Sequence, residues 1–229
     1  MRAILLAAGF GTRLRPLTDN IPKCLVPIKG RPLMDHWLDR LTQAGIGPFL
    51  INTHYLAEHV AAFIQSSVYR DQVTLVNETK LLGTAGTLIA NLSYFGGKDG
   101  LLIHADNYCL ADFKAFEEAH HNRPLECQMT MMTFRTSSPS DCGILELDRR
   151  GVVVGFYEKV ENPPGNLANG AVYMLSAELI NRLKSDFKKA NDFSTDVVQD
   201  LMGFIYTYET HAVFQDIGTP ETYRAINEL

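Results

Sequence analysis

The chain has 229 residues, of which 46% are apolar and 21% charged, and a formal net charge of −5. This length can bury one large hydrophobic core, and the composition is that of an ordinary folded domain rather than a disordered chain. No lysine and arginine run is dense enough to bind a phosphate backbone, so no nucleic-acid partner is expected.

The cysteines and the hydrophobic segments indicate the cellular setting. Four scattered cysteines form no Cys-x-x-Cys pair, which argues against a disulfide framework and a structural zinc site: Cys24, Cys109, Cys127 and Cys142. The apolar start of the chain breaks at Gly9 and leads into a basic segment, as a buried strand would and a signal peptide would not. No stretch approaches the roughly twenty apolar residues that span a bilayer, so we expect a cytoplasmic protein without membrane contact.

The first half of the chain alternates between two hydrophobic patterns. Short runs rich in β-formers predict strands at 3–7, 49–52, 73–76 and 101–104. Between them, helical periodicity predicts helices at 32–44, 56–65 and 84–91, with Thr84 as the cap of the last. This alternation is typical of βαβ units, so we expect an α/β fold with three layers (α/β/α) and a mostly parallel, Rossmann-like central sheet.

The second half reads differently. It predicts strands at 128–135, 143–147, 152–158 and 169–175, with a polar hairpin turn at Asp148–Gly151. Helices are expected at 177–183, 193–202 and from Pro220 to the end, the last one capped by Thr219. We therefore expect antiparallel or mixed additions to the same sheet, within a single domain over 1–229.

A glycine-containing loop follows the first strand directly. Gly9 and Gly11 let the backbone turn sharply, and Arg13 and Arg15 could add charge-assisted contacts to a phosphate. The loop lacks the third glycine of a dinucleotide fingerprint and the Gly-Lys-Ser/Thr of a P-loop. Taken alone, these residues fit a phosphate loop or an ordinary turn with surface arginines.

Two aspartates follow predicted strands. Asp106 comes after the strand at 101–104, and Asp216 comes after a short apolar run at 212–214. Ligands in open α/β sheets collect beyond the carboxyl ends of strands, and magnesium takes one or two protein carboxylates together with substrate phosphates. The residues alone favour Asp216 as a turn residue that merely ends the strand.

The longer context around the glycine loop is specific. Residues 5–18 read LLAAGFGTRLRPLT and residues 21–28 read IPKCLVPI. This pair resembles the signature of the sugar-phosphate nucleotidyltransferases: Gly-x-Gly-Thr-Arg, Pro-Leu-Thr and then Pro-Lys-x-Leu-x-Pro. The resemblance covers nearly the whole chain, from Ala3 to Thr222. It implies joining of a nucleoside triphosphate to a sugar 1-phosphate, with release of pyrophosphate.

The resemblance also implies roles for individual residues. The nucleotide would be bound by Leu6, Ala8, Gly9, Gly11, Thr12, Arg13, Glu78, Gly83 and Thr84. Arg13 and Lys23 would be catalytic, and Lys23, between Pro22 and Pro27, sits on a stiffened segment where a lone lysine would otherwise be a solvated surface residue. Mg²⁺ would be held by Asp106 and Asp216. Many relatives read Asn-Gly-Asp where this chain has His104-Ala105-Asp106, which changes the loop before the first metal ligand.

The sugar phosphate would be bound by a second set, mostly from the second half: Asp106, Gly143, Glu158, Lys159, Asn169 and Gly170. The nucleotide-binding half would span about 1–115 and the sugar-binding half about 116–229. The run Leu82-Gly83-Thr84-Ala85-Gly86 is frequent among enzymes that act on mannose- or heptose-type 1-phosphates with GTP. The pattern is therefore most similar to short mannose-1-phosphate and manno-heptose-1-phosphate guanylyltransferases. Several relatives also carry a C-terminal β-helix, for which we expect no room here.

Other activities remain open from the sequence. The same fold could serve a uridylyltransferase acting on N-acetylmuramic acid or glucose 1-phosphate, a CTP:phosphocholine cytidylyltransferase, or a non-catalytic regulatory homologue. A phosphocholine site would be expected to add an aromatic cage for the quaternary amine. The sequence leaves the oligomeric state open, a homo-oligomer included.

Overall fold

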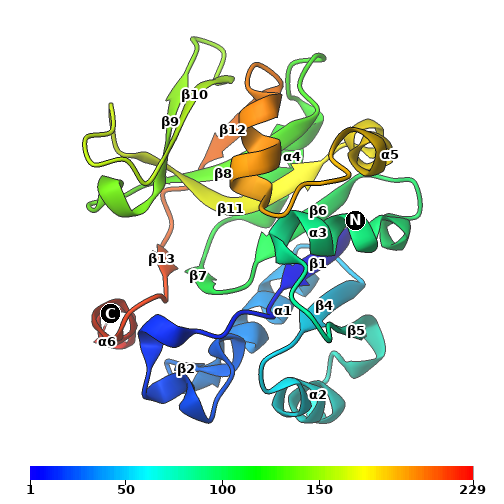
Figure 1. Cartoon of the computed structure of the whole chain (residues 1–229), viewed down its shortest axis with the longest axis vertical. Helices are drawn as coiled ribbons and strands as arrows, with labels where there is room; N and C mark the ends of the chain where they lie inside the picture. The colour runs from blue at the N-terminus through cyan, green and yellow to red at the C-terminus, as the bar shows by residue number, and fades with distance from the viewer. Residues whose placement is uncertain (229) are drawn as a thin grey trace. The chain divides into compact units, whose positions relative to one another are not determined.

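The computed structural model describes residues 1–228 (Figure 1). The chain divides into two compact units. Unit 1 contains 1–81, 103–111 and the residues from Ala212 onward, and unit 2 contains 82–102 and 112–211. The chain thus passes from one unit to the other several times. The expected division into halves near residue 115 stays a prediction about function, since the compact units follow a different, interleaved division.

Unit 1 is built on parallel strands. Strand β4 (Phe49–Thr53) pairs in parallel with β1 (Arg2–Leu6) and with β5 (Val73–Asn77), and every residue of β4 is buried. Helices α1 (Leu33–Gln43) and α2 (Ala57–Ser66) connect these strands. The apolar residues 49–51 at the start of β4 are typical of a strand covered on both faces.

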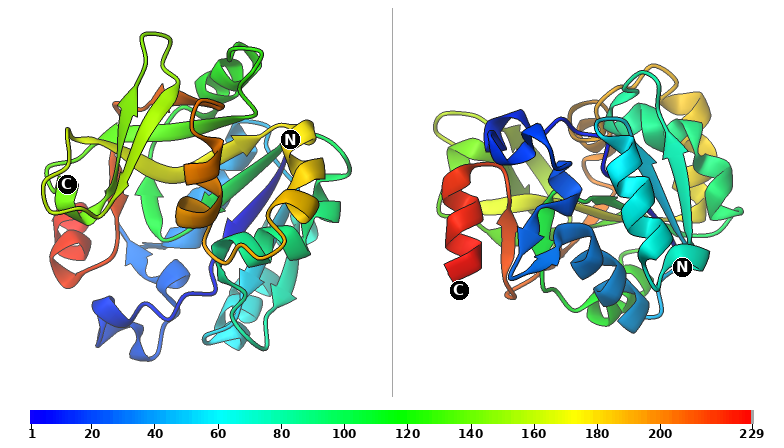
Figure 2. Two further views of the ribbon diagram at one scale, coloured as in Figure 1. Left: turned by 45° about the horizontal axis from the view of Figure 1, so that its top comes forward. Right: turned by 90° about the horizontal axis from the view of Figure 1, so that it is seen from below.

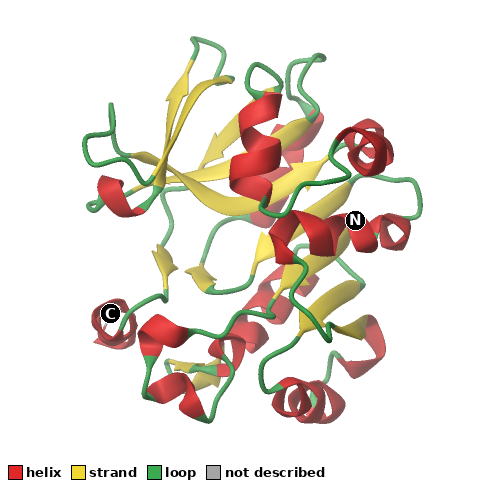
Figure 3. Cartoon of the chain, in the orientation of Figure 1, coloured by secondary structure: helices red, strands yellow, loops and turns green. Residues whose placement is uncertain are grey.

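Short elements complete unit 1. Strands β2 (Pro27–Ile28) and β3 (Arg31–Pro32) form one small antiparallel pair, and β7 (Asn107–Cys109) pairs antiparallel with β13 (Phe214–Asp216). Figure 2 shows α6 (Pro220–Glu228) following β13 at the end of the chain, and Figure 3 shows the short helical turns near β2.

The cap of α6 forms as predicted, because the Thr219 Oγ1 accepts a hydrogen bond from the Thr222 N–H at 3.3 Å. Pro220 opens the helix directly after it.

Unit 2 contains the mixed strands that the second half of the sequence predicts. Strand β11 (Leu167–Leu175) pairs antiparallel with β8 (Met129–Arg135) and with β9 (Gly143–Leu147), which pairs antiparallel with β10 (Val153–Glu158). Strand β12 (Ile205–Glu209) pairs in parallel with β8. The prediction missed β12, whose five residues carry no long apolar run.

The predicted turn between β9 and β10 is confirmed. The Asp148 Oδ1 accepts hydrogen bonds from the N–H groups of Arg150 and Val152, at 2.8 and 2.9 Å. These bonds close the hairpin.

The helices of unit 2 correct two details of the prediction. The helix α3 (Gly83–Ala90) begins before Thr84, so Thr84 is not its cap. The expected α-helix at 193–202 is instead a π-helical turn (Ser194–Val198) followed by a 3₁₀ turn (Gln199–Leu201). Helix α5 (Ala177–Asp186) is confirmed, whereas α4 (Phe113–His121) was not predicted.

Strand β6 (Gly100–His104) is continuous from unit 2 into unit 1. The nine-stranded sheet has the order β10-β9-β11-β6-β1-β4-β5, and β8 pairs with β11 and β12. The predicted α/β class with a mixed central sheet is therefore confirmed. Among the helices of residues 1–228, none has the length and hydropathy of a membrane span.

The buried histidine of α4, His120, contacts Thr130 on β8 and Asp99, all within unit 2. His120 has no exposed surface, and its Nδ1 lies 2.8 Å from Thr130 Oγ1 on β8. Its Nε2 lies 3.4 Å from Asp99 Oδ2, while Asp99 Oδ1 accepts the Ala177 N–H at the start of α5. Burial, helped by the charge of Arg123, lowers the pKa of His120 to about 4.

This shift predicts a loss of stability in mild acid. The folded pKa of His120 lies below the ordinary value of 6.5, so the unfolded chain takes up the proton first as pH falls. The part of the folding stability that depends on neutral His120 is therefore complete above pH ~6.5 and is lost as pH falls toward 4. Denaturant titrations would measure the free energy of unfolding at pH 7 and at pH 4.5. Between these pH values His120→Gln should lose about 1–3 kcal/mol less of this free energy than the wild type. The neighbouring control His121→Gln should lose as much as wild type, and an unchanged loss in His120→Gln would contradict the assignment.

Candidate active site

The loop after β1 is held in a shape that requires glycine. Gly11 has a φ of +62°, in the left-handed region, and its carbonyl oxygen accepts a hydrogen bond from the buried Thr18 hydroxyl at 2.8 Å. A Cβ at Gly11 would lie 3.1 Å from both Lys23 Cβ and Thr18 Cγ2. Thr12 and Arg13 follow in a 3₁₀ turn. The loop is thereby packed directly against the segment that carries Lys23.

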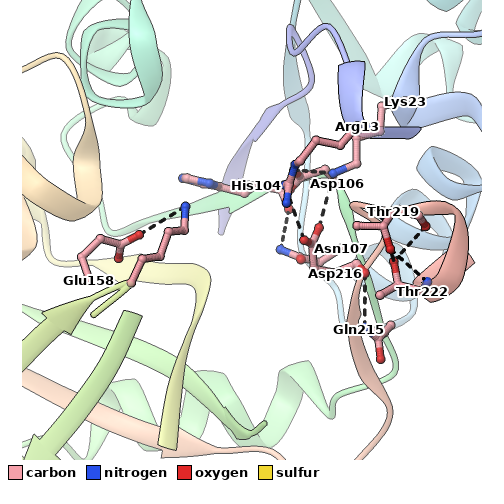
Figure 4. Close-up of polar contacts among 11 residues, drawn as sticks. Arg13, Lys23, His104, Asp106, Asn107, Glu158, Gln215, Asp216, Thr219 and Thr222 are labelled. Carbon is pink, nitrogen blue, oxygen red and sulfur yellow. Dashed lines mark hydrogen bonds and ion pairs between the residues drawn. The ribbon is translucent and has the colours of Figure 1, made fainter. Parts of the chain in front are cut away.

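Lys23 lies between the two predicted metal ligands (Figure 4). Its Nζ is 2.8 Å from Asp106 Oδ2 and 3.3 Å from Asp216 Oδ1. Arg13 Nη2 approaches the same Asp216 through Oδ2, at 3.8 Å. Pro22 leads into the 3₁₀ turn that carries Lys23, and the lysine side chain is only 10% exposed. Four residues predicted from separate motifs thus form one charged cluster in unit 1, the Lys23 cluster (Arg13, Lys23, Asp106, Asp216).

The electrostatics of the Lys23 cluster favour the charged forms. Burial alone would lower the pKa of Lys23, but the charges of Asp106 and then Asp216 outweigh it and the pKa is raised. Burial alone would raise the pKa of Asp106, yet the charge of Lys23, followed by that of His104, lowers it. Both partners therefore remain ionised around neutral pH.

The two aspartates fit a magnesium site. Their side chains are 45% and 48% exposed, and each brings an oxygen to the same ammonium group, so the two carboxylates converge. Over residues 1–228 no group of three or more His, Cys, Asp or Glu side chains is arranged to hold a metal ion. Magnesium commonly needs no such group, because it keeps waters and binds substrate phosphates beside one or two carboxylates.

The loop that replaces the usual Asn-Gly before Asp106 is well anchored. The Ala105 N–H donates to the Leu6 carbonyl at 3.0 Å, and Ala105 is fully buried. Asn107 Nδ2 lies 3.4 Å from the His104 carbonyl oxygen. Leu6, predicted in the nucleotide set, therefore helps to fix the backbone just before Asp106.

Glu78 belongs to a buried hydrogen-bond chain. Its Oε1 accepts from Asn52 Nδ2 at 2.9 Å, and Asn52 Oδ1 accepts from the Ala7 N–H at 2.8 Å. Glu78 is only 6% exposed. These hydrogen bonds link the end of β5 to Ala7, and the next residue, Ala8, is also buried. Sequence reasoning missed Asn52, although a polar side chain near the end of the apolar strand FLINT is a recognisable signal.

Gly83 and Thr84 lie in unit 2. Gly83 has a φ of +76°, and a Cβ there would collide with the Asn191 carbonyl oxygen. The Thr84 hydroxyl accepts from the Phe193 N–H at 2.7 Å and donates to Asp192 Oδ2 at 3.2 Å. The segment around residue 192, which no sequence motif indicated, thus fixes this part of the predicted nucleotide set.

Part of the predicted sugar-phosphate set also meets in unit 2. Gly143 and Glu158 are direct partners in the antiparallel pairing of β9 with β10. A Cβ at Gly143 would lie 2.5 Å from Glu158 Oε2 and 2.5 Å from Phe156 Cε2. Lys159 follows with a φ of +50°, and its Nζ lies 3.5 Å from Glu158 Oε1. The absence of a side chain at residue 143 leaves the Glu158 carboxylate its place.

Asn169 and Gly170 lie where the pairing of β11 with β8 shifts register. Asn169 Nδ2 donates to the Tyr173 hydroxyl at 2.8 Å, and Asn169 Oδ1 accepts from the Ala171 N–H at 2.8 Å. Ala171 has a φ of +53°, a conformation unusual for a residue with a side chain. The contact of Asn169 with a sugar hydroxyl stays a prediction. Its amide holds the bulge at Gly170–Ala171 in place.

The packing at Gly143 gives a testable expectation. Gly143→Ala should raise the KM for the sugar phosphate about tenfold to a hundredfold while leaving the KM for the nucleotide near its wild-type value, because the new methyl displaces Glu158. Steady-state kinetics with each substrate varied in turn would measure this. Gly165→Ala is the control, since a Cβ there meets nothing within 4 Å. A Gly143→Ala enzyme with an unchanged sugar-phosphate KM would contradict the assignment.

The sequence profile of the Nucleotidyl transferase family matches residues 2–229. The chain belongs to this family. Its members generally use a divalent metal ion, which agrees with the convergent carboxylates of the Lys23 cluster.

Several curated members of the family are similar over nearly the whole chain. The mannose-1-phosphate guanylyltransferase of Mycobacterium tuberculosis is 29% identical over 96% of this chain, which covers 62% of that protein. The catalytic subunit beta of the Drosophila melanogaster mannose-1-phosphate guanylyltransferase is 27% identical over 97% of this chain, which covers 60% of it. The chain therefore spans less than two thirds of the length of these relatives.

Solved structures share the fold over nearly their full length. HddC from Yersinia pseudotuberculosis matches with a TM-score of 0.83 and 26% identity, covering 99% of this chain and 98% of that one. A second structure of HddC, complexed with GMP-PN, matches with a TM-score of 0.82. A chain from Bacillus anthracis reaches a TM-score of 0.86 at 21% identity, which shows the shared fold alone.

Proposed function

We propose that this protein transfers a guanylyl group from GTP to a sugar 1-phosphate of the mannose or manno-heptose type, giving a GDP-sugar and pyrophosphate. The Lys23 cluster carries this proposal, because it brings two cations and two carboxylates together at the glycine loop, where a triphosphate would bind and react. The choice of base and sugar follows relatives named mannose-1-phosphate guanylyltransferases and the HddC structure complexed with GMP-PN.

The reaction would be an in-line attack by an oxygen of the sugar 1-phosphate on the α-phosphorus of GTP. The new P–O bond forms as the bond between the α-phosphorus and the bridging oxygen breaks, and pyrophosphate leaves with the electron pair. Little covalent chemistry is asked of the protein, so catalysis rests on positioning and on charge neutralisation.

Each member of the Lys23 cluster has a distinct part in this chemistry. The glycine loop would place backbone N–H groups along the triphosphate, and Arg13 would add a charge-assisted contact. Lys23 would offset the negative charge that builds up at the reacting phosphate. Asp106 and Asp216 would hold Mg²⁺, which supplies further positive charge to the phosphates when it is bound.

In unit 2, Gly83 and Thr84 would contact the nucleotide, and the part of the predicted sugar-phosphate set that lies there would orient the acceptor. Glu158 is suited to accept hydrogen bonds from sugar hydroxyls, and Gly143 leaves room for its carboxylate. Lys159 would contact the phosphate. Asn169 and Gly170 would contact the sugar from the bulge in β11. We place the enzyme in the cytoplasm, where nucleoside triphosphates are available.

Pyrophosphate release tests the proposal. GTP, UTP, CTP, dTTP and ATP would each be combined with the 1-phosphates of mannose, manno-heptose, glucose, N-acetylglucosamine and N-acetylmuramic acid, and with phosphocholine. We expect release with GTP and a mannose- or heptose-type phosphate, lost on chelation by EDTA and restored by Mg²⁺. Turnover of UTP with another sugar, or of CTP with phosphocholine, would contradict the substrate assignment. Nucleotide binding without any turnover would indicate a regulatory homologue.

A further inference from the structure

Unit 2 contains a hydrogen-bonded path between two stations that the proposed function assigns to different substrates. One is the base turn (Gly83–Ala85), at the start of α3, and the other is the sugar turn (Asn169–Ala171), in the bulge of β11. The two are more than eighty residues apart in the sequence. The segment Asn191–Ser194, here called the clamp, contacts the base turn and also Tyr173, which holds the sugar turn.

The clamp holds the base turn through three hydrogen bonds. The Ala85 N–H donates to the Asn191 carbonyl at 3.0 Å, and the Phe193 N–H donates to the Thr84 hydroxyl at 2.7 Å. The Thr84 hydroxyl in turn donates to Asp192 Oδ2 at 3.2 Å. With Gly83 lying so close to the Asn191 carbonyl that no side chain fits, the base turn cannot shift without the clamp.

Two carboxylates hold the clamp by hydrogen bonds. Asp196 Oδ2 accepts the N–H groups of Asn191 and Asp192, at 2.8 and 3.0 Å, and these two bonds are the main reason that the pKa of Asp196 is lowered. Asp192 Oδ1 accepts the Thr195 N–H at 3.0 Å. The carboxylates of Asp192 and Asp196 thus hold the clamp at both ends, and a displacement at one end would reach the other.

The other end of the clamp meets the sugar turn through a buried tyrosine. The rings of Phe193 and Tyr173, both fully buried, lie 4.8 Å apart between centroids, and the Tyr173 hydroxyl is 3.4 Å from Ser194 Oγ. The same hydroxyl accepts from Asn169 Nδ2 at 2.8 Å, and Asn169 fixes the Ala171 N–H. Tyr173 is therefore bonded to the sugar turn and packed on the clamp at the same time.

We propose that Thr84 and Tyr173 are the two ends of one brace that positions the base turn and the sugar turn together. Tyr173 would then be a positioning residue for the nucleotide as well as for the sugar phosphate, although its ring lies in the core and reaches the base turn only through the clamp. The inference rests on the proposed function, which assigns the two turns to the two substrates.

The brace is tested by measuring whether a substitution at either end changes the KM for both substrates. Thr84→Val and Tyr173→Phe each delete a hydroxyl while keeping the shape of the side chain, and each should raise the KM for both substrates about two- to tenfold, the range for one or two lost hydrogen bonds. The double variant should raise each KM by little more than the larger single effect, because both changes interrupt one path. Tyr206→Phe, on β12 of the same unit, is the matched control and should leave both KM values unchanged.

The two KM values distinguish a positioning role of these residues from a role in stability alone. A purely structural role would lower the melting temperature and the active fraction, and therefore kcat, without moving either KM. If Thr84→Val affects only the nucleotide and Tyr173→Phe only the sugar phosphate, or if the two effects multiply in the double variant, the brace is overturned. A wild-type enzyme without turnover would instead contradict the proposed function, and the inference would fall with it.

Discussion

Replacing Asp106 by asparagine is expected to lower kcat for pyrophosphate release about a thousandfold, because the variant removes one of two convergent carboxylate charges from the magnesium site. The fold should persist, since the Asp106 side chain is 45% exposed and Lys23 retains its contact with Asp216. Kinetics at saturating substrates and a thermal melt would measure the two effects separately.

The control for this variant is Asp71→Asn, at an exposed aspartate of the same unit, which should leave kcat within twofold. A magnesium titration followed by calorimetry, with nucleotide present, should show weakened metal binding in Asp106→Asn alone. Full magnesium-dependent activity of Asp106→Asn would refute the metal assignment.

Lys23→Met should reduce kcat about a hundredfold to a thousandfold, the range for losing one preorganised charge from a phosphate-transfer site. Methionine keeps the buried, unbranched stem of a side chain that is only 10% exposed, so packing against Gly11 is retained. The measurement is single-turnover chemistry at saturating GTP, which separates loss of the reacting charge from loss of binding.

Lys98→Met, at an exposed lysine of unit 2, provides the matched control and should behave as wild type. Raising the magnesium concentration should not restore Lys23→Met, because the lost charge belongs to the protein. Turnover of Lys23→Met within fivefold of wild type would show that Lys23 only keeps Asp106 and Asp216 together.

The parts of the fold that the sequence predicted well are those in which a local pattern determines the structure. β4 begins with the apolar run 49–51, which is typical of a strand buried on both faces. The cap at Thr219 follows from a threonine directly before a proline. By contrast, α4 was missed although Asp112 caps it and its buried residues Phe113, Phe116 and His120 follow helical spacing. β12 was missed because its five residues carry no long apolar run.

The sequence also predicted some residues of the site, whereas other contacts of the site appear only in the fold. The motif indicated Lys23, Asp106 and Asp216 one by one, and folding brings them within hydrogen-bond distance across 83 and 193 residues of sequence. That Thr84 binds the clamp instead of capping α3 could not be predicted, because the competing partner lies 108 residues away. Side-chain networks such as Asn52 with Glu78 leave no periodic signal, and they become visible only in three dimensions.

Attack by an oxygen of the sugar phosphate on the α-phosphorus of GTP is tested most directly by an isotope experiment. Mannose 1-phosphate labelled with ¹⁸O at its three non-bridging phosphate oxygens would be incubated with unlabelled GTP, Mg²⁺ and the full chain, and the products analysed by mass spectrometry. We expect GDP-mannose that carries all three labels, together with unlabelled pyrophosphate. Loss of label from the sugar nucleotide, or guanosine monophosphate formed without any GDP-mannose, would contradict it.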